Sequence, residues 1–306
     1  MARPIQKQVA ATVQSIQPQA QETQPPAQSV NIDWTKVPYS HTALYGDSGV
    51  GKSSMAATYP KSPERPMLVL MFDPPDKATP YIEQGASCRW VEEEYYTSLG
   101  IKAHSVLNQE GQEVVRVEYY TDPDPYTPRA MDQIEARLAS FETEAPSWAT
   151  VVIDSMTFYQ FAALRRAQAR MNFDPSQMFQ KGAQIDSRQW YMIAKMDIER
   201  VLKSGMMWWE TNTIAVFHTS EDKEEFGSEV VRGLLTVGKL QKELPAGFSE
   251  MYRLYVVRSK EGYKHWAQTR NDGLWAATSL MAKAPNPCEP TYQGVWMEYA
   301  KRKGLL

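Results

Sequence analysis

GDSGVGKS, at residues 46–53, follows the apolar run TALY at 42–45 and precedes the helix-forming run SMAA at 54–57. It matches the pattern G-x-x-x-x-G-K-[ST] at every fixed position. The glycines Gly46, Gly49 and Gly51 carry no side chains that would obstruct the backbone, so consecutive N–H groups can turn toward one phosphate. A strand before this loop and a helix after it predict a nucleotide-binding site in an α/β protein.

Two side chains of the loop add charge and metal chemistry. Lys52 would place a point charge on the β- and γ-phosphates, and the Ser53 hydroxyl would be one ligand of Mg²⁺, which prefers oxygen donors. We therefore expect ATP and Mg²⁺ as cofactors. The residues expected to hold the nucleotide are Gly46, Asp47, Ser48, Gly49, Val50, Gly51, Lys52, Ser53 and Ser54. The alternative is a Gly-rich turn, which would not require a lysine and a hydroxyl at these two positions.

The composition is that of a globular protein without a strong charge bias. The 306 residues are 42% hydrophobic and 23% charged, with a formal net charge of −3. This length allows one large α/β domain or two small ones. The charge gives no overall attraction to nucleic acid, so contact with DNA or RNA would need local patches.

Cysteine content and hydropathy bound the compartment. Cys88 and Cys288 are too few for a disulfide framework or a Cys-rich zinc site, which indicates a reducing, cytoplasmic location. No run approaches the roughly 18 apolar residues of a membrane span, and the N-terminus lacks the apolar block of a secretory signal. We therefore expect no membrane partner.

The chain divides into three parts by composition. Residues 1–30 are rich in Gln, Pro, Ala and Ser, which predicts a disordered tail that acts either as a solubilising segment or as a partner-binding arm. Residues 31–285 are expected to form the nucleotide-binding domain. Residues 286–306 are assigned to a C-terminal extension.

Strand-like and helix-like segments alternate through the predicted domain. We expect strands at 41–45, 66–72, 114–120, 148–153 and 211–218, and helices at 51–59, 129–144, 157–172 and 186–204. The stretch from 86 to 124 is otherwise less regular. The runs MYRLYVVR and YKHWAQT, separated by SKEG, predict a β-hairpin. This alternation predicts a mostly parallel sheet flanked by helices, with the hairpin extending one edge.

A second acidic position accompanies the loop. The strand TVVID ends at Asp154, at the strand edge where ligands of open α/β sheets bind, and this carboxylate would hold Mg²⁺ together with Ser53. The alternative is that Asp154 caps the helix that follows. The next residue is Ser155 and not glutamate, so the chain lacks the Asp-Glu pair usual in AAA+ proteins.

Further polar residues at strand ends are candidates for the catalytic chemistry, beside Lys52. The sequence MFDPPD offers Asp73 and Asp76 after a buried strand that we expect beside the phosphate loop, and either carboxylate could orient an attacking water. The alternative is a tight DPPD turn. His218 ends another strand and is a candidate sensor of the γ-phosphate, or a satisfied strand-end histidine. The charged segment at 219–225 behind it is predicted to be a mobile loop.

Taken together, these motifs resemble the RecA-like core of P-loop ATPases. More narrowly, they resemble an AAA-type ATP-binding family of phage proteins that includes single-strand annealing recombinases. The resemblance covers about residues 35–280. It implies ATP hydrolysis coupled to single-stranded DNA in recombination, repair or replication, in the host cytoplasm if the protein is phage-encoded. One departure is Pro75, which stands where RecA-like proteins carry a glutamate.

The resemblance also implies a homo-oligomer, either a ring or a filament. A cation from the neighbouring subunit would complete the γ-phosphate cage. The candidates are Lys239, Lys242, Arg258 and Arg270.

Single-stranded DNA would require a basic and aromatic surface. The candidates are the run Arg165-Arg166-Ala167-Gln168-Ala169-Arg170 and the pair Trp208-Trp209 with Lys203. The alternatives are a solvated helix face for the arginines and core packing or a subunit contact for the tryptophans. Two other function classes stay open: a nucleotide-gated interaction protein with little hydrolysis, and a small-molecule kinase.

Overall fold

The computed structural model describes residues 36–124, 127–139, 141–171, 187–223, 230–236 and 240–305. The predicted tail at 1–30 lies outside these residues. Within them, no helix is both long and apolar enough to cross a membrane.

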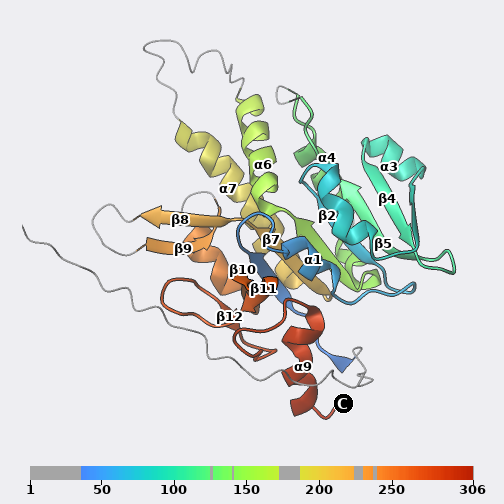
Figure 1. Cartoon of the computed structure of the whole chain (residues 1–306). Helices are drawn as coiled ribbons and strands as arrows, with labels where there is room; N and C mark the ends of the chain where they lie inside the picture. The colour runs from blue at the N-terminus through green and yellow to red at the C-terminus, as the bar shows by residue number, and fades with distance from the viewer. Residues whose placement is uncertain are drawn as a thin grey trace, which may run out of the picture.

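Ten strands form one large sheet, which Figure 1 shows at the centre of the molecule. From one edge to the other, nine of them are β11 (Gly262–Gln268), β10 (Glu250–Ser259), β1 (His41–Tyr45), β7 (Asn212–Phe217), β6 (Thr150–Asp154), β2 (Met67–Met71), β5 (Glu113–Tyr119), β4 (Lys102–Leu107) and β3 (Ser87–Trp90). The short β12 (Thr278–Ser279) pairs with β10. A separate two-stranded sheet consists of β8 (Thr219–Lys223) and β9 (Val230–Leu234).

The six strands from β10 to β5 run parallel, and the strands outside them run antiparallel to their neighbours. This confirms the predicted α/β class with a mostly parallel sheet. It also confirms the hairpin, because β10 and β11 pair across the predicted turn and β11 is an edge strand. One expectation is wrong: β2 is not beside the phosphate-loop strand. The neighbours of β1 are β7 and β10, and β2 pairs with β6 and β5.

Helices cover both faces of the sheet (Figure 1). They are α1 (Lys52–Ala57), α2 (Thr79–Ile82), α3 (Glu94–Leu99), α4 (Ala130–Leu138), α5 (Phe141–Glu144), α6 (Met156–Arg170), α7 (Ser187–Lys203), α8 (Leu240–Glu243) and α9 (Tyr292–Arg302). One face packs against α1, α2 and α9, and the opposite face packs against α4, α6 and α7. This two-sided burial explains the continuous apolar runs of the central strands.

The strand β2 shows how one strand serves two cores. Leu68 and Leu70 belong to the cluster on the α6 side, whereas Met67, Val69 and Met71 belong to the cluster on the α1 side, and all five are fully buried. Successive side chains of a strand point to opposite faces, so a strand covered on both faces needs apolar residues at every position. The site therefore sits on a rigid sheet.

Two predictions for irregular segments are corrected by the structure. The stretch 86–124 contains two further strands and a helix, β3, α3 and β4. The segment predicted as a loop after His218 begins with the strand β8, which pairs with β9. Both strands are rich in polar residues and lack an apolar alternation, because neither β3 nor β8 lies within the central parallel sheet.

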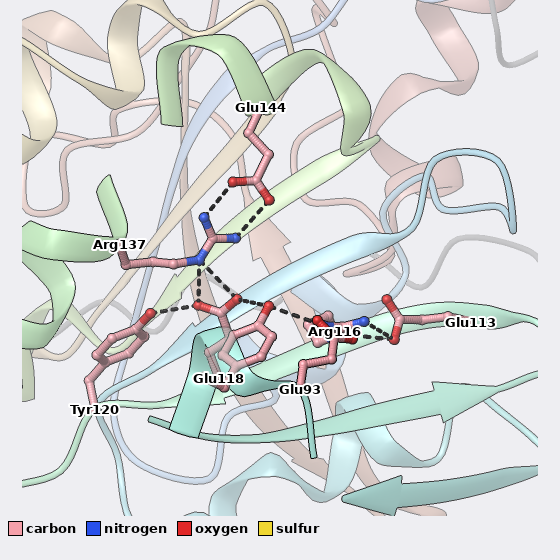
Figure 2. A network of polar contacts seen from close by, with 8 residues as sticks. Glu93, Glu113, Arg116, Glu118, Tyr120, Arg137 and Glu144 are labelled. Carbon is pink, nitrogen blue, oxygen red and sulfur yellow. Dashed lines mark hydrogen bonds and ion pairs between the residues drawn. The ribbon is translucent and has the colours of Figure 1, made fainter. Parts of the chain in front are cut away.

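A buried ionic network links β5 with α3, α4 and α5 (Figure 2). The Glu118 carboxylate on β5 is fully buried and accepts hydrogen bonds from the hydroxyls of Tyr96 and Tyr120, at 2.8 and 2.5 Å, and from Nε of Arg137 at 3.1 Å. Arg137 on α4 also donates to Glu144 on α5 at 2.5 Å. Every charge of this network meets an opposite charge or a hydroxyl, as burial requires.

Candidate nucleotide site

The phosphate loop, residues 46–53, connects β1 to α1 at the carboxyl edge of the sheet. Gly46 has φ +156°, and a Cβ there would lie 2.5 Å from the carbonyl oxygen of Leu254, so only glycine fits. Gly51 is left-handed at φ +94° and immediately precedes α1. The imidazole of His265 donates to the Val50 carbonyl at 2.9 Å and braces the loop from β11. The loop conformation therefore depends on β10 and β11 as well as on its glycines.

Lys52 is buried beneath this loop. Its ammonium donates to the carbonyl oxygens of Gly46 at 2.9 Å and Asp47 at 2.6 Å. Burial lowers the pKa of Lys52, and the charges of Asp154, Asp73 and Asp47 act in the opposite direction. Among the described residues no carboxylate lies within ion-pair distance of the ammonium. A buried cation with only backbone carbonyls as hydrogen-bond partners is suited to an anionic ligand.

Asp154 ends β6 and is 2% exposed. Its Oδ2 accepts a hydrogen bond from the Tyr81 hydroxyl at 2.7 Å. Burial, together with the charge of Asp73, raises the pKa of Asp154 to about 6, whereas the nearby Ser53 hydroxyl acts to lower it. The two residues predicted to hold Mg²⁺ thus lie near each other.

Asp73 follows β2 and reaches the same point. Its Oδ1 accepts from the Ser155 hydroxyl at 2.5 Å and from the Ser155 backbone N–H at 3.1 Å. Direct pairing of β2 with β6 accounts for this approach, because Met71 lies opposite Asp154 in the register. The peptide bond between Asp154 and Ser155 is cis.

The alternative that Asp154 caps the following helix is wrong. The N-cap of α6 is Ser155, whose side chain accepts from the backbone N–H of Phe158 at 3.4 Å. Serine is a favoured N-cap residue, and its hydroxyl simultaneously donates to Asp73. Asp154 therefore stays available for another partner.

His218 follows β7, the strand between the loop strand and the Asp154 strand. It is half-buried, and its backbone N–H donates to the Thr157 hydroxyl at 3.1 Å. Burial and the positive charge of Lys52 lower the pKa of His218. The negative charges of Asp73 and Asp47 oppose this shift with smaller effects. The imidazole is therefore neutral at pH 7. The next residue, Thr219, donates its hydroxyl hydrogen to the Asp47 carboxylate. The β7 end thereby contacts the phosphate loop.

The structure separates the two carboxylates of the DPPD turn. Asp73 joins the site, whereas Asp76 is exposed in a short 3₁₀ helix, 3.9 Å from the ammonium of Lys77. Sequence reasoning missed Tyr81 and the bonding role of Ser155. Neither belongs to a recognisable motif, and Tyr81 comes from a four-residue helix with no apolar periodicity to mark its buried face.

The residues present fit a magnesium nucleotide. A loop with glycines at positive φ leaves its N–H groups clear, and a buried ammonium lies beneath it. Mg²⁺ usually takes one or two protein oxygens plus phosphates and waters, so Ser53 and Asp154 suffice. No cluster of three or more His, Cys, Asp or Glu that could hold a metal occurs in the described parts of the chain.

The candidate cations for a neighbouring site fall at separate places. Lys239 lies outside the described residues. Lys242 is exposed on α8, Arg258 is exposed near the end of β10, and Arg270 is exposed beyond β11. A role on a neighbouring subunit stays a prediction for all of them.

The arginine run on α6 is largely occupied by ion pairs. Arg166 is 2% exposed and contacts Asp132, Glu135 and Asp197 at 3.3, 2.6 and 2.6 Å. Arg170 pairs with Asp132 at 3.2 Å. Arg166 is therefore part of a buried ionic cluster. It lies neither on a DNA-binding surface nor on a solvated helix face.

The tryptophan pair divides between core and solvent. Trp209 is 6% exposed and packs against Phe141 with ring centroids 4.4 Å apart, as the core-packing alternative expects. Trp208 is 78% exposed, and its indole N–H donates to the Lys203 carbonyl. The Lys203 ammonium pairs with Glu199 at 2.9 Å. Of Trp208, Trp209 and Lys203, only Trp208 has a side chain that is largely exposed and neither packed in the core nor ion-paired.

Three solved structures are similar to this chain at low identity. A KaiC-like protein from the archaeon Pyrococcus horikoshii OT3 is 12% identical, with a TM-score of 0.40 over 76% of this chain and 79% of that chain. An ATPase of the type III secretion system of pathogenic bacteria is 13% identical, with a TM-score of 0.39 over 71% of this chain and 52% of that chain, so this chain spans about half of its length. The flagellar accessory protein FlaH from Methanocaldococcus jannaschii is 9% identical, with a TM-score of 0.34 over 82% of this chain and 84% of that chain.

No protein-family model and no curated protein matches this chain.

Proposed function

We propose that this protein binds ATP with Mg²⁺ and hydrolyses it, as a RecA-like P-loop ATPase. The observation that carries the proposal is the buried Lys52 ammonium beneath the glycine loop, which donates to the loop carbonyls of Gly46 and Asp47. The Ser53 hydroxyl and the charge of Lys52 both act to lower the pKa of the buried Asp154 carboxylate at the end of β6, so these groups lie near one another. A hydroxyl, a carboxylate and an ammonium beside a glycine loop are the parts that a magnesium triphosphate requires.

In this proposal, each polar group of the candidate site has a defined role. The loop N–H groups and Lys52 bind the phosphates, and Ser53 with Asp154 holds the metal. Bound Mg²⁺ would neutralise charge on the phosphate oxygens. Asp73 orients the attacking water as a hydrogen-bond acceptor, and neutral His218 responds to the terminal phosphate from the end of β7.

A more specific proposal concerns the substrate. We extend it to single-stranded DNA in phage recombination, repair or replication, with the protein as a ring or filament in the host cytoplasm. The resemblance of the motif set supports this extension. Within the α6 arginine run, Arg166 does not belong to the proposed DNA surface, because it is buried and ion-paired.

A nucleotide-gated interaction protein with little hydrolysis is the second candidate. Pro75 replaces the glutamate of RecA-like proteins, and Asp73 already accepts two hydrogen bonds from Ser155. A carboxylate engaged in this way has less capacity to accept a proton from water, which favours slow turnover.

The test is ATP binding and phosphate release, with and without single-stranded DNA, in the wild type and in Lys52→Ala. Lys77→Ala, an exposed lysine at the same edge of the sheet, is the control. DNA-stimulated turnover that Lys52→Ala abolishes supports the ATPase. Tight binding without turnover supports the switch, and phosphate transfer to a small acceptor would support a kinase. Unchanged nucleotide affinity in Lys52→Ala would refute the site.

A further inference from the structure

A cavity of about 390 Å³ opens beside the phosphate loop. The loop residues 46–50 form one wall, and Thr219, Trp275 and residues 253–256 of β10 line the remainder. None of the latter residues belongs to the loop motif. The cavity therefore connects the loop with the ends of β7 and β10, on both sides of β1.

Arg253 is the cation of this cavity. It lies on β10 directly opposite Tyr45, the residue that precedes Gly46. Its guanidinium carbon is 3.6 Å from the ring centroid of Trp275, and its Nη1 donates to Gln268 at 3.2 Å. The side chain is thus half-buried and fixed in direction beside the loop.

The guanidinium has no ion-pair partner in the part of the chain that the structure describes. Asp272 and Asp47 act on Arg253 only through longer-range charge. Arginine stays protonated in proteins, so a half-buried guanidinium has donors left over for an anion. Arg116, which is likewise half-buried, contacts the carboxylates of Glu93 and Glu113.

The platform under Arg253 is tied to the phosphate loop. Asp272 accepts from the Trp275 backbone N–H at 2.7 Å, and the Tyr45 hydroxyl donates to the Ala276 carbonyl at 2.5 Å. Trp275 is 7% exposed. A rigid ring held by the loop strand itself keeps the guanidinium in place at low entropic cost.

We propose that Arg253 binds the terminal phosphate of the nucleotide in cis, as a second cation beside Lys52. This inference rests on the proposed ATP site. A neighbouring subunit would then not be needed to supply the positive charge, because the same chain presents it from β10. Arginine suits this task, since its planar fork meets two phosphate oxygens at once.

The experiment measures affinity for a non-hydrolysable ATP analogue and for ADP, both with Mg²⁺, in the wild type, Arg253→Gln and Arg253→Lys. Arg253→Gln is expected to weaken analogue binding by about 10- to 100-fold, the loss of a charge-assisted contact, with little change for ADP. Arg253→Lys falls between, because it keeps the charge and loses the fork. Arg89→Gln, an exposed arginine on the far edge strand β3, is expected to match the wild type.

Two outcomes would overturn the inference and leave ATP binding intact. An unchanged ratio of analogue to ADP affinity in Arg253→Gln excludes a contact to the terminal phosphate, whether or not the thermal stability falls. Recovery of high-affinity analogue sites on mixing Lys52→Ala with Arg253→Gln shows that the arginine acts between subunits. A wild-type protein that binds neither nucleotide refutes the ATP site itself, and Arg253 with it.

Discussion

The hydroxyl of Tyr81 donates a hydrogen bond of 2.7 Å to Oδ2 of Asp154. Tyr81 is fully buried on α2, between the DPPD turn and β3. Groups that bond to a metal ligand from behind fix its orientation and tune its affinity. If Asp154 holds Mg²⁺ as proposed, Tyr81 is the residue that positions it.

Tyr81→Phe is expected to weaken Mg²⁺-dependent nucleotide binding by about 10- to 100-fold, because the carboxylate loses the bond that orients it. Binding in EDTA should change little. Titration calorimetry at several Mg²⁺ concentrations measures this. Tyr263→Phe, an exposed tyrosine on β11, is the control. Equal losses with and without Mg²⁺ would assign Tyr81 a general structural role instead.

Asp154→Asn is expected to stabilise the metal-free protein and to impair its function. Asp154 is buried and repelled by Asp73, so its ionised form is unfavourable, whereas an amide keeps the bond from Tyr81 without the charge. Thermal unfolding in EDTA should show a higher midpoint for the variant. Mg²⁺ should stabilise the nucleotide complex of the wild type and not that of the variant. A lower midpoint would show that the carboxylate is favourably placed even without metal.

Asp73→Asn and Asp76→Asn are expected to differ sharply. Asp73 contacts Ser155 within the site, whereas Asp76 is exposed beside Lys77. Loss of an acceptor for the attacking water typically lowers turnover by about 10²- to 10⁴-fold. Phosphate release should fall by that order in Asp73→Asn and stay near the wild-type rate in Asp76→Asn. The reverse pattern would move the catalytic role to the end of the DPPD turn.

Arg137→Met is expected to destabilise the protein by about 3–5 kcal/mol, because it leaves the charge of Glu118 buried without a cation. Urea unfolding measures the loss. The double variant with Glu118→Leu should recover most of it, since both buried charges are then gone. Arg116→Met should lose less, because both partners of Arg116, Glu113 and Glu93, are more exposed than Glu118. No recovery in the double variant would mean that packing, and not charge, dominates this network.

Lys61 gives a test of pH dependence. Burial lowers its pKa from 10.5 to about 8, and its ammonium donates to the Ala57 carbonyl at the end of α1. The unfolded chain therefore binds more protons than the native state between about pH 8 and pH 10.5. The free energy of unfolding thus rises with pH through that window.

Lys61→Met removes this contribution. The difference in free energy of unfolding between the wild type and Lys61→Met is expected to shift in favour of the wild type between pH 7 and pH 10. The difference between the wild type and Lys102→Met, a variant at an exposed position on β4, should not change with pH. Urea unfolding of the three proteins across the window gives the differences. Parallel curves for the wild type and Lys61→Met would contradict the lowered pKa.

Much of the fold could be predicted because its signals are local. The strand β1 has the bounds expected from the sequence, and the helices α6 and α7 lie within two residues of their predicted limits. The polar strands β3 and β8 escaped prediction because their pairing partners, and not their own composition, make them strands. Local propensity therefore located the central sheet and the hairpin at one edge, and missed strands at the opposite edge and in the small separate sheet.

By itself the sequence determined the phosphate loop, its Lys52 and Ser53, and a strand ending in Asp154, because a fixed spacing of residue types suffices to specify these. Only the tertiary structure decided which groups meet there. Asp73 joins the site because β2 pairs with β6, and Tyr81 and Arg253 reach it from α2 and β10, segments with no motif of their own. Such contacts depend on strand order and register, and these are set by pairing between residues far apart in the chain.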